Sequence, residues 1–151
     1  MTKRILVIED NQKHIDDAKA FFADKPEYQV EYAENGEKAF RLLNNPSNIY
    51  DGVITDIFMP WGEHYPSEQP AGFGIAILCC DMGIPCVMNT AGHHHGQKYQ
   101  WIHCLSTSGS LRPKLGGMID GGLQDMGTEA DTKRWNFVEM SLKEKMNQPK
   151  S

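Results

Sequence analysis

The chain has 151 residues and a net charge of −5, a length that suits one domain with a sizeable hydrophobic core. Its scattered acidic residues argue against direct binding of nucleic acid, which requires a basic surface, and no apolar run is long enough to span a membrane. The N-terminus lacks the pattern of a signal peptide, so we expect a cytoplasmic protein. We expect a single domain over residues 1–147 and a disordered tail at 148–151.

The first elements alternate between strand and helix patterns. Residues 4–8 form a short apolar run without helical period, typical of a central parallel strand that is buried on both faces. A helix with Asn11 as its cap follows through residue 24. Residues 28–33 alternate like a strand, and residues 34–45 predict a second helix with its apolar residues on one face.

The alternation continues through the middle of the chain. Residues 50–60 predict the third strand, residues 72–83 a mostly apolar helix that ends at a glycine, and residues 84–91 the fourth strand. Cys79 and Cys80 fall within this helix, and we expect reduced thiols there because the cysteine spacing fits neither a zinc motif nor a redox pair. The alternation predicts a parallel sheet with crossover helices on both faces.

The last third of the chain gives weaker signals. Residues 96–105 favour a helix, and the glycine-rich segment around residues 118–120 favours at most a short strand. Thr128 and Asp131 have the spacing of a capping box, which predicts that the last helix begins there and continues to about residue 146.

Acidic side chains follow two of the predicted strands. Glu9 and Asp10 end the first strand, Asp56 ends the third, and Thr90 ends the fourth. Ligands of open parallel sheets bind beyond the carboxyl ends of the strands, so three carboxylates converge if the first and third strands are neighbours. Mg²⁺ would relieve their mutual repulsion. A carboxylate can also take up a phosphoryl group as a nucleophile, with a hydroxyl to stabilise the transferring charge.

A cluster of histidines offers an alternative metal site. His93, His94 and His95 follow the fourth strand, and two of them with His64 or Cys104 would suit zinc. Three adjacent imidazoles cannot all face one metal without strain, so the other interpretation is a polar, pH-sensitive loop over the pocket.

Four segments resemble the receiver domain of two-component response regulators. They are RILVIEDN, YDGVITDIFMP, GFGIAIL and IPCVMNTA, at residues 4–11, 50–60, 72–78 and 84–91. The resemblance covers residues 3–91 well and the remainder poorly. It implies a doubly wound α/β fold of the flavodoxin-like (βα)5 type, with five parallel strands in the order 2-1-3-4-5.

The resemblance also implies a role for each matching residue. Asp56 matches the phosphoacceptor, and Glu9 and Asp10 match the acidic pair that holds Mg²⁺ together with it. Phe58 matches the position whose backbone carbonyl faces the metal, and Thr90 the hydroxyl that hydrogen-bonds the phosphoryl group. The implied protein is a signalling domain rather than an enzyme, phosphorylated by a histidine kinase or a phosphotransfer protein. A shift of the surface of the fourth helix, fifth strand and fifth helix then reaches a protein target.

Two features depart from the family pattern. Residues 61–71 lengthen the connection after Asp56 and are expected to gate the pocket or contact a partner. The lysine that normally ends the fifth strand has no clear match, and Lys114 is the candidate for it. Two hypotheses therefore remain: a phosphoacceptor receiver, or a receiver-like interaction module with a lost or altered phosphoryl switch.

Overall fold

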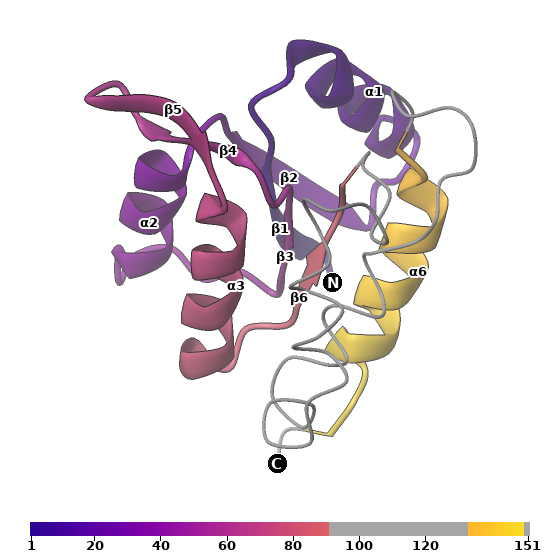
Figure 1. The fold of residues 1–151 in the computed structure, drawn as a ribbon. Coiled ribbons are helices and arrows are strands. Elements are labelled where there is room, and N and C mark those ends of the chain that lie inside the picture. The colour runs from indigo at the N-terminus through magenta and orange to yellow at the C-terminus, as the bar shows by residue number, and fades with distance from the viewer. Residues whose placement is uncertain (91–132, 150–151) are drawn as a thin grey trace, which may run out of the picture.

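A computed structural model describes residues 1–90 and 133–149 (Figure 1). No helix in these two segments is long and apolar enough to cross a membrane. Their elements in chain order are β1 (Lys3–Ile8), α1 (Gln12–Phe22), β2 (Tyr28–Ala33), α2 (Gly36–Asn44), β3 (Gly52–Thr55), β4 (Met59–Gly62), β5 (Tyr65–Gln69), α3 (Ala71–Met82), β6 (Cys86–Met88) and α6 (Trp135–Met146).

The main sheet is parallel, and its strand order is β2-β1-β3-β6. This order confirms the predicted arrangement of the first four strands. The fifth strand, expected around residues 118–120, lies outside the described residues. Ile8 pairs with both Ala33 and Thr55, and Thr55 pairs with Met88. The carboxyl ends of all four strands therefore meet at one edge of the sheet.

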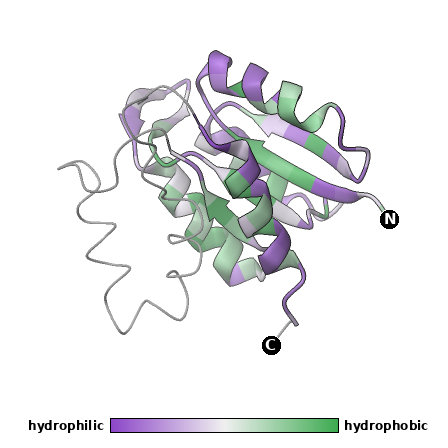
Figure 2. Ribbon diagram, turned by 90° about the vertical axis from the view of Figure 1, so that its right-hand side faces the viewer, coloured by the Kyte–Doolittle hydropathy of each residue, from purple (hydrophilic) through white to green (hydrophobic). Residues whose placement is uncertain are grey.

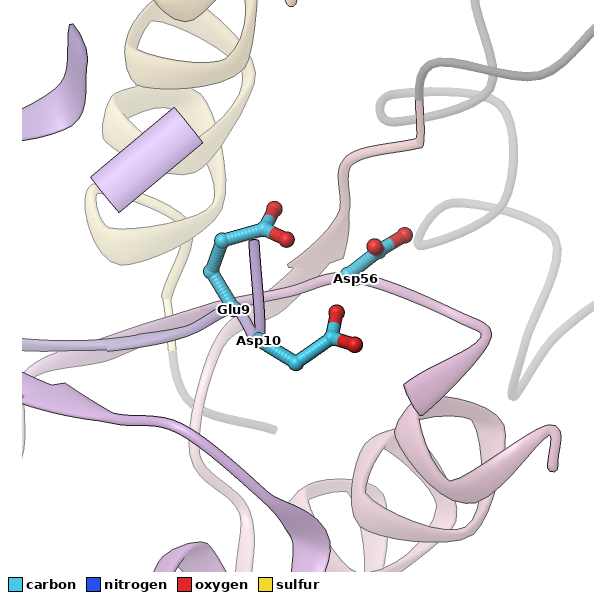
Figure 3. Close-up of side chains that lie close together, drawn as sticks. All are labelled: Glu9, Asp10 and Asp56. Carbon is cyan, nitrogen blue, oxygen red and sulfur yellow. The ribbon is translucent and has the colours of Figure 1, made fainter. Parts of the chain in front are cut away.

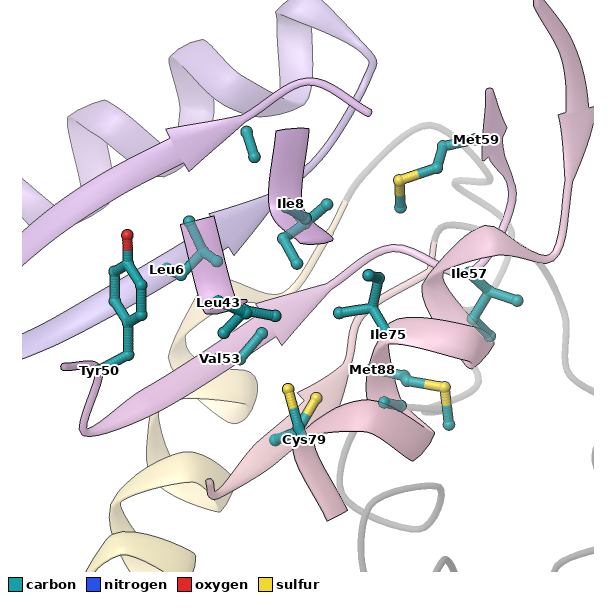
Figure 4. Packing of buried hydrophobic residues seen from close by; sticks show 14 residues of the cluster. Leu6, Ile8, Leu43, Tyr50, Val53, Ile57, Met59, Ile75, Cys79 and Met88 are labelled. Atoms are coloured by element: carbon teal, nitrogen blue, oxygen red, sulfur yellow. The ribbon is translucent and has the colours of Figure 1, made fainter. Parts of the chain in front are cut away.

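Helices cover both faces of this sheet, as the alternation predicted. Along β1, Leu6 and Ile8 face α2 and α3 and join a cluster that includes Met88 (Figure 4). The intervening Ile5 and Val7 face α1 and α6 on the opposite side. Because successive side chains of a strand point to opposite faces, a strand covered on both faces is apolar throughout. In Figure 2 the central strands are largely green, and purple is concentrated on the outer turns of the helices.

Capping residues predicted from the sequence mark some of the observed helix ends. The Asn11 side chain accepts hydrogen bonds from the first turn of α1, as expected of a cap. Gly83 ends α3 in the left-handed conformation with φ of 70°, which glycine adopts without strain. The predicted start of the last helix is wrong, because α6 begins only at Trp135 and has no side-chain cap. Thr128 and Asp131, the expected capping box, lie outside the described residues.

The long connection after Asp56 is a β-hairpin rather than a loop. β4 and β5 pair antiparallel, in a separate two-stranded sheet beside α2. Trp61 fills a notch above Gly36, where an added Cβ would lie 2.5 Å from the indole ring. Phe40 packs against Trp61 with ring centroids 6.1 Å apart and is 44% exposed. Phe40 therefore covers the hairpin rather than joining the buried core.

The cysteines of the described residues form no disulfide, which agrees with the prediction of reduced thiols. Cys79 and Cys86 are buried between α3 and β6, and Cys80 is half-buried. A hydrogen bond with Cys79, together with burial, raises the pKa of the Cys86 thiol well above its ordinary value. Such a thiol stays protonated and unreactive, which suits a packing role.

Candidate functional site

Three carboxylates meet at the carboxyl edge of the sheet. Glu9 and Asp10 follow β1, and Asp56 follows β3, the neighbouring strand. One ligand oxygen from each lies within 4.8 Å of the other two. Figure 3 shows the three side chains around one small space. The predicted convergence is therefore present.

The backbone of Asp56 is fixed from several sides. Its N–H donates to the Ile8 carbonyl at 2.9 Å, and its carbonyl accepts from Thr55 Oγ1 at 2.8 Å. The first turn of α3 then presses against the same carbonyl at Gly72, where an added Cβ would lie 1.5 Å from the Asp56 oxygen. Asp56 Oδ1 accepts the Ile57 N–H at 2.7 Å. These contacts leave Oδ2 as the oxygen available for chemistry.

A buried lysine from the far end of the chain completes the cluster. Lys133 has a side chain only 1% exposed and lies just before α6. Its Nζ donates to Glu9 Oε2 and to the backbone carbonyl of Asn89 at 3.0 Å. It also lies 3.3 Å from Asp56 Oδ2. The Lys133 ammonium therefore contacts the carboxylate of Asp56 directly.

Sequence reasoning missed Lys133 and proposed Lys114, which lies outside the described residues. A weak signal was present in the sequence. Lys133 and Arg134 stand at the entrance to the last helix, where the helix dipole disfavours cations. A lysine in such a place suggests a requirement other than helix stability. The predicted helix start at Thr128 hid this signal, because it placed Lys133 beyond the first turn, where the effect of the dipole has faded.

The charges of the cluster influence one another strongly. Burial raises the pKa of the Glu9 carboxyl to about 7, with Asp56 acting in the same direction and Lys133 opposing it. Burial and the charge of Asp56 raise the pKa of Asp10. Three carboxylates face one ammonium, so negative charge remains in excess when all are ionised. A divalent cation would neutralise this excess.

The remaining predicted site residues lie at varying distances from this cluster. Thr90 is buried just beyond β6, at the same edge of the sheet, and Phe58 is half-buried between Asp56 and the hairpin. His64 is exposed in the hairpin. The other members of the proposed zinc site, His93–His95 and Cys104, lie outside the described residues, so that alternative stays a prediction.

Comparison with known proteins gives matches at the level of structure. No protein-family model and no curated protein sequence matches the chain. The non-phosphorylated HemR receiver domain from Leptospira biflexa matches with a TM-score of 0.59 and 18% identity, over 99% of this chain and 98% of that one. The signal receiver domain of a putative LuxO repressor protein from Vibrio parahaemolyticus matches with a TM-score of 0.58 and 17% identity, over 96% and 93%. The chain has the fold of response-regulator receiver domains.

The chain also matches a solved structure whose description names a different activity. A structure described as adenylate cyclase from Rhodopirellula baltica matches with a TM-score of 0.61 and 15% identity, over 96% of this chain and 90% of that one. At such identities the likeness establishes the fold, and function has to be argued from the site.

Proposed function

We propose that the chain is a phosphoacceptor receiver that takes up a phosphoryl group on Asp56 with the help of Mg²⁺. The observation that carries the proposal is the arrangement around Asp56. Two further carboxylates and the Lys133 ammonium surround a side chain whose backbone is fixed and whose Oδ2 is available. This is the donor set that aspartyl phosphorylation requires.

The donor atoms fit a hard divalent cation. Carboxylates of Glu9, Asp10 and Asp56, with the Phe58 backbone carbonyl, would hold Mg²⁺ through oxygen alone. Asp10 is exposed, which suits a metal that keeps several waters. When bound, the cation would draw negative charge from the transferring phosphoryl group.

Each residue then has a chemical task. Asp56 Oδ2 attacks phosphorus, and the bond from phosphorus to the donor's leaving group breaks. Lys133, already beside Oδ2, pairs with the developing charge on the phosphoryl oxygens. Thr90, at the end of the neighbouring strand, donates its hydroxyl to the phosphoryl group. The proposed physiological donor is a histidine kinase or a phosphotransfer protein, and the proposed output is a contact with another protein.

The main reason to favour an interaction module without a phosphoryl switch was the missing lysine. Lys133 supplies an ammonium at the acidic cluster, so this reason no longer applies. We therefore retain the phosphoacceptor function alone.

The test is the intact mass of the full chain after incubation with acetyl phosphate and Mg²⁺, with Asp56→Asn as the matched control. We expect one phosphoryl adduct on the wild type, dependent on Mg²⁺, and none on the variant. An adduct of equal yield on folded Asp56→Asn would disprove the assignment of Asp56, and no adduct on folded wild type would disprove the function.

A further inference from the structure

His14 is a buried polar residue for which the proposed phosphoryl transfer provides no role. It lies in the first turn of α1 and is 6% exposed. Its Nδ1 has no hydrogen-bond partner among the residues that the structure describes. Buried polar atoms of folded proteins are nearly always paired, so an unpaired ring nitrogen calls for a physical reason.

His14 is connected to the acidic cluster through Asn11. The Asn11 backbone N–H donates to Glu9 Oε1 at 3.0 Å, and the Asn11 side-chain oxygen accepts the His14 backbone N–H at 3.4 Å. The other Glu9 oxygen, Oε2, accepts from Lys133. Glu9 thus lies between the helical turn that carries His14 and the ammonium of Lys133.

Burial, together with the nearby charge of Lys133, favours the neutral form of the His14 imidazole. Burial lowers the pKa of His14, and the positive charge of Lys133 is the next cause. Lys13 acts in the same direction, while Asp56 and Asp17 oppose it. Lys133 is therefore the charge that acts most strongly on this ring. A neutral imidazole carries one nitrogen without a proton, and that nitrogen can accept a hydrogen bond.

The ammonium of Lys133 loses an acceptor if the proposed chemistry takes place. Its three N–H groups face Glu9 Oε2, the Asn89 carbonyl and Asp56 Oδ2. Glu9 Oε2 cannot bind a metal ion while it accepts a hydrogen bond from Lys133. Once Lys133 loses its hydrogen bond to Glu9, one N–H of this buried ammonium needs a new acceptor, because an unpaired buried charge is strongly unfavourable.

Three buried side-chain atoms in the described segments lack a partner: Asn89 Nδ2, Trp135 Nε1 and His14 Nδ1. The amide and indole nitrogens carry hydrogens and can only donate. Among these three atoms, the imidazole nitrogen alone can accept from an ammonium.

We propose that His14 is a positioning residue for Lys133, whose ammonium donates to His14 Nδ1 the N–H that Glu9 releases. The imidazole then holds the ammonium toward a phosphoryl group on Asp56 and does not touch that group itself. The inference rests on the proposed function, and its test separates the two.

The first experiment compares His14→Leu with His14→Gln in the full chain. The leucine removes the acceptor, and the glutamine restores one. We expect His14→Leu to slow phosphoryl uptake from saturating acetyl phosphate about tenfold, as the loss of one hydrogen bond to a charged group would. His14→Gln should stay within about threefold of wild type. Mg²⁺ affinity without donor should fall in His14→Leu and stay near that of wild type in His14→Gln, because Mg²⁺ binding requires Glu9 to release the N–H that His14 accepts.

Two results of this comparison would contradict the proposal. A His14→Leu rate equal to that of the wild type would remove the role. Equal slowing in both variants would indicate a purely structural effect, particularly if their thermal unfolding shifts in parallel. A Lys133→Met background gives a further check, since His14→Leu should add no effect on beryllofluoride affinity once Lys133 is absent.

The second experiment does not depend on phosphorylation. The ¹⁵N resonance of His14 Nδ1 is followed during addition of Mg²⁺ and then beryllofluoride, and is assigned from its absence in His14→Gln. We expect it to move in the direction of a nitrogen that accepts a hydrogen bond. An unchanged resonance at saturating Mg²⁺ would overturn the role of His14 even if Asp56 is phosphorylated. Conversely, a shift in a chain that takes no phosphoryl group would support His14 while the proposed function fails.

Discussion

Single residues hold the phosphoacceptor in place through its backbone. The carbonyl of Asp56 is enclosed by the hydroxyl of Thr55 and by the Cα of Gly72. A glycine is required at this point because of the close approach, not because of its backbone angle, since its φ is not positive. The first turn of α3 therefore contributes directly to the position of Asp56.

Gly72→Ala should damage the site, and Gly74→Ala is its matched control. The introduced methyl group at position 72 would overlap the Asp56 carbonyl, so α3 has to move away. We expect a loss of about 1–3 kcal/mol in the free energy of unfolding and a slower phosphoryl uptake. A Cβ at residue 74 meets no atom within 4 Å, and alanine favours a helix by about 0.5–1 kcal/mol.

Denaturant unfolding and the intact-mass assay measure both effects. Gly74→Ala should be slightly more stable than wild type and equally active. If Gly72→Ala behaves like Gly74→Ala, the close contact at Asp56 has no consequence for the site.

At the scale of elements, the β4–β5 hairpin joins the phosphoacceptor segment to α2. β4 begins at Met59, shortly after Asp56, and the chain returns from β5 directly into α3. Between these points Trp61 lies in the notch above Gly36 and beside Phe40. Trp61 thus anchors the hairpin to α2, while Met59 at the start of β4 is buried in the main core. The register of the hairpin is irregular between Pro60 and Gly62, on either side of Trp61.

Trp61→Ala should release the hairpin from α2 without unfolding the main sheet. The indole is half-buried and provides the aromatic contact with α2. We expect amide exchange in residues 59–69 to accelerate by about tenfold or more, since losing an anchor worth about 1.5 kcal/mol raises local opening by that factor. Tyr65→Ala is the control, because Tyr65 is 63% exposed in the same hairpin.

Amide hydrogen exchange read by mass spectrometry separates the segments. Exchange of β1 and β3 should be unchanged in Trp61→Ala. If those strands accelerate as much as the hairpin, Trp61 supports the whole domain rather than this one element.

At the scale of the molecule, the hydrophobic pattern predicted the elements that are buried in the main core. The parallel sheet, its helical layers and the position of Asp56 were predicted from the apolar runs of β1 and β3 and from the amphipathic pattern of α1. The hairpin was not predicted, because its strands are short, carry Pro60 and Pro66, and pack on α2 rather than within the main core. Lys133 was missed because its partners Glu9 and Asp56 are distant in sequence, and the weak local signal at the start of α6 does not identify them.

The acidic cluster should make overall stability depend on pH in the absence of metal. Burial raises the pKa of Glu9 from 4.5 to about 7 in the folded protein. Between these values the folded protein binds a proton that the unfolded chain lacks, so this carboxyl's contribution falls as pH rises. The loss is about 3 kcal/mol across the window. The lowered pKa of His14 acts in the opposite direction near the upper part of the window.

Comparison with Glu9→Gln isolates the contribution of Glu9. Urea unfolding in EDTA at several pH values between about 4.5 and 7.5 should give a free energy of unfolding that falls more steeply with pH in wild type than in the variant. The lowered pKa values of Glu31 and Glu139 affect both proteins equally and act at more acidic pH. Parallel profiles would mean that Lys133 keeps Glu9 ionised throughout. The folded protein would then have Glu9 ready for a metal at any pH in this range.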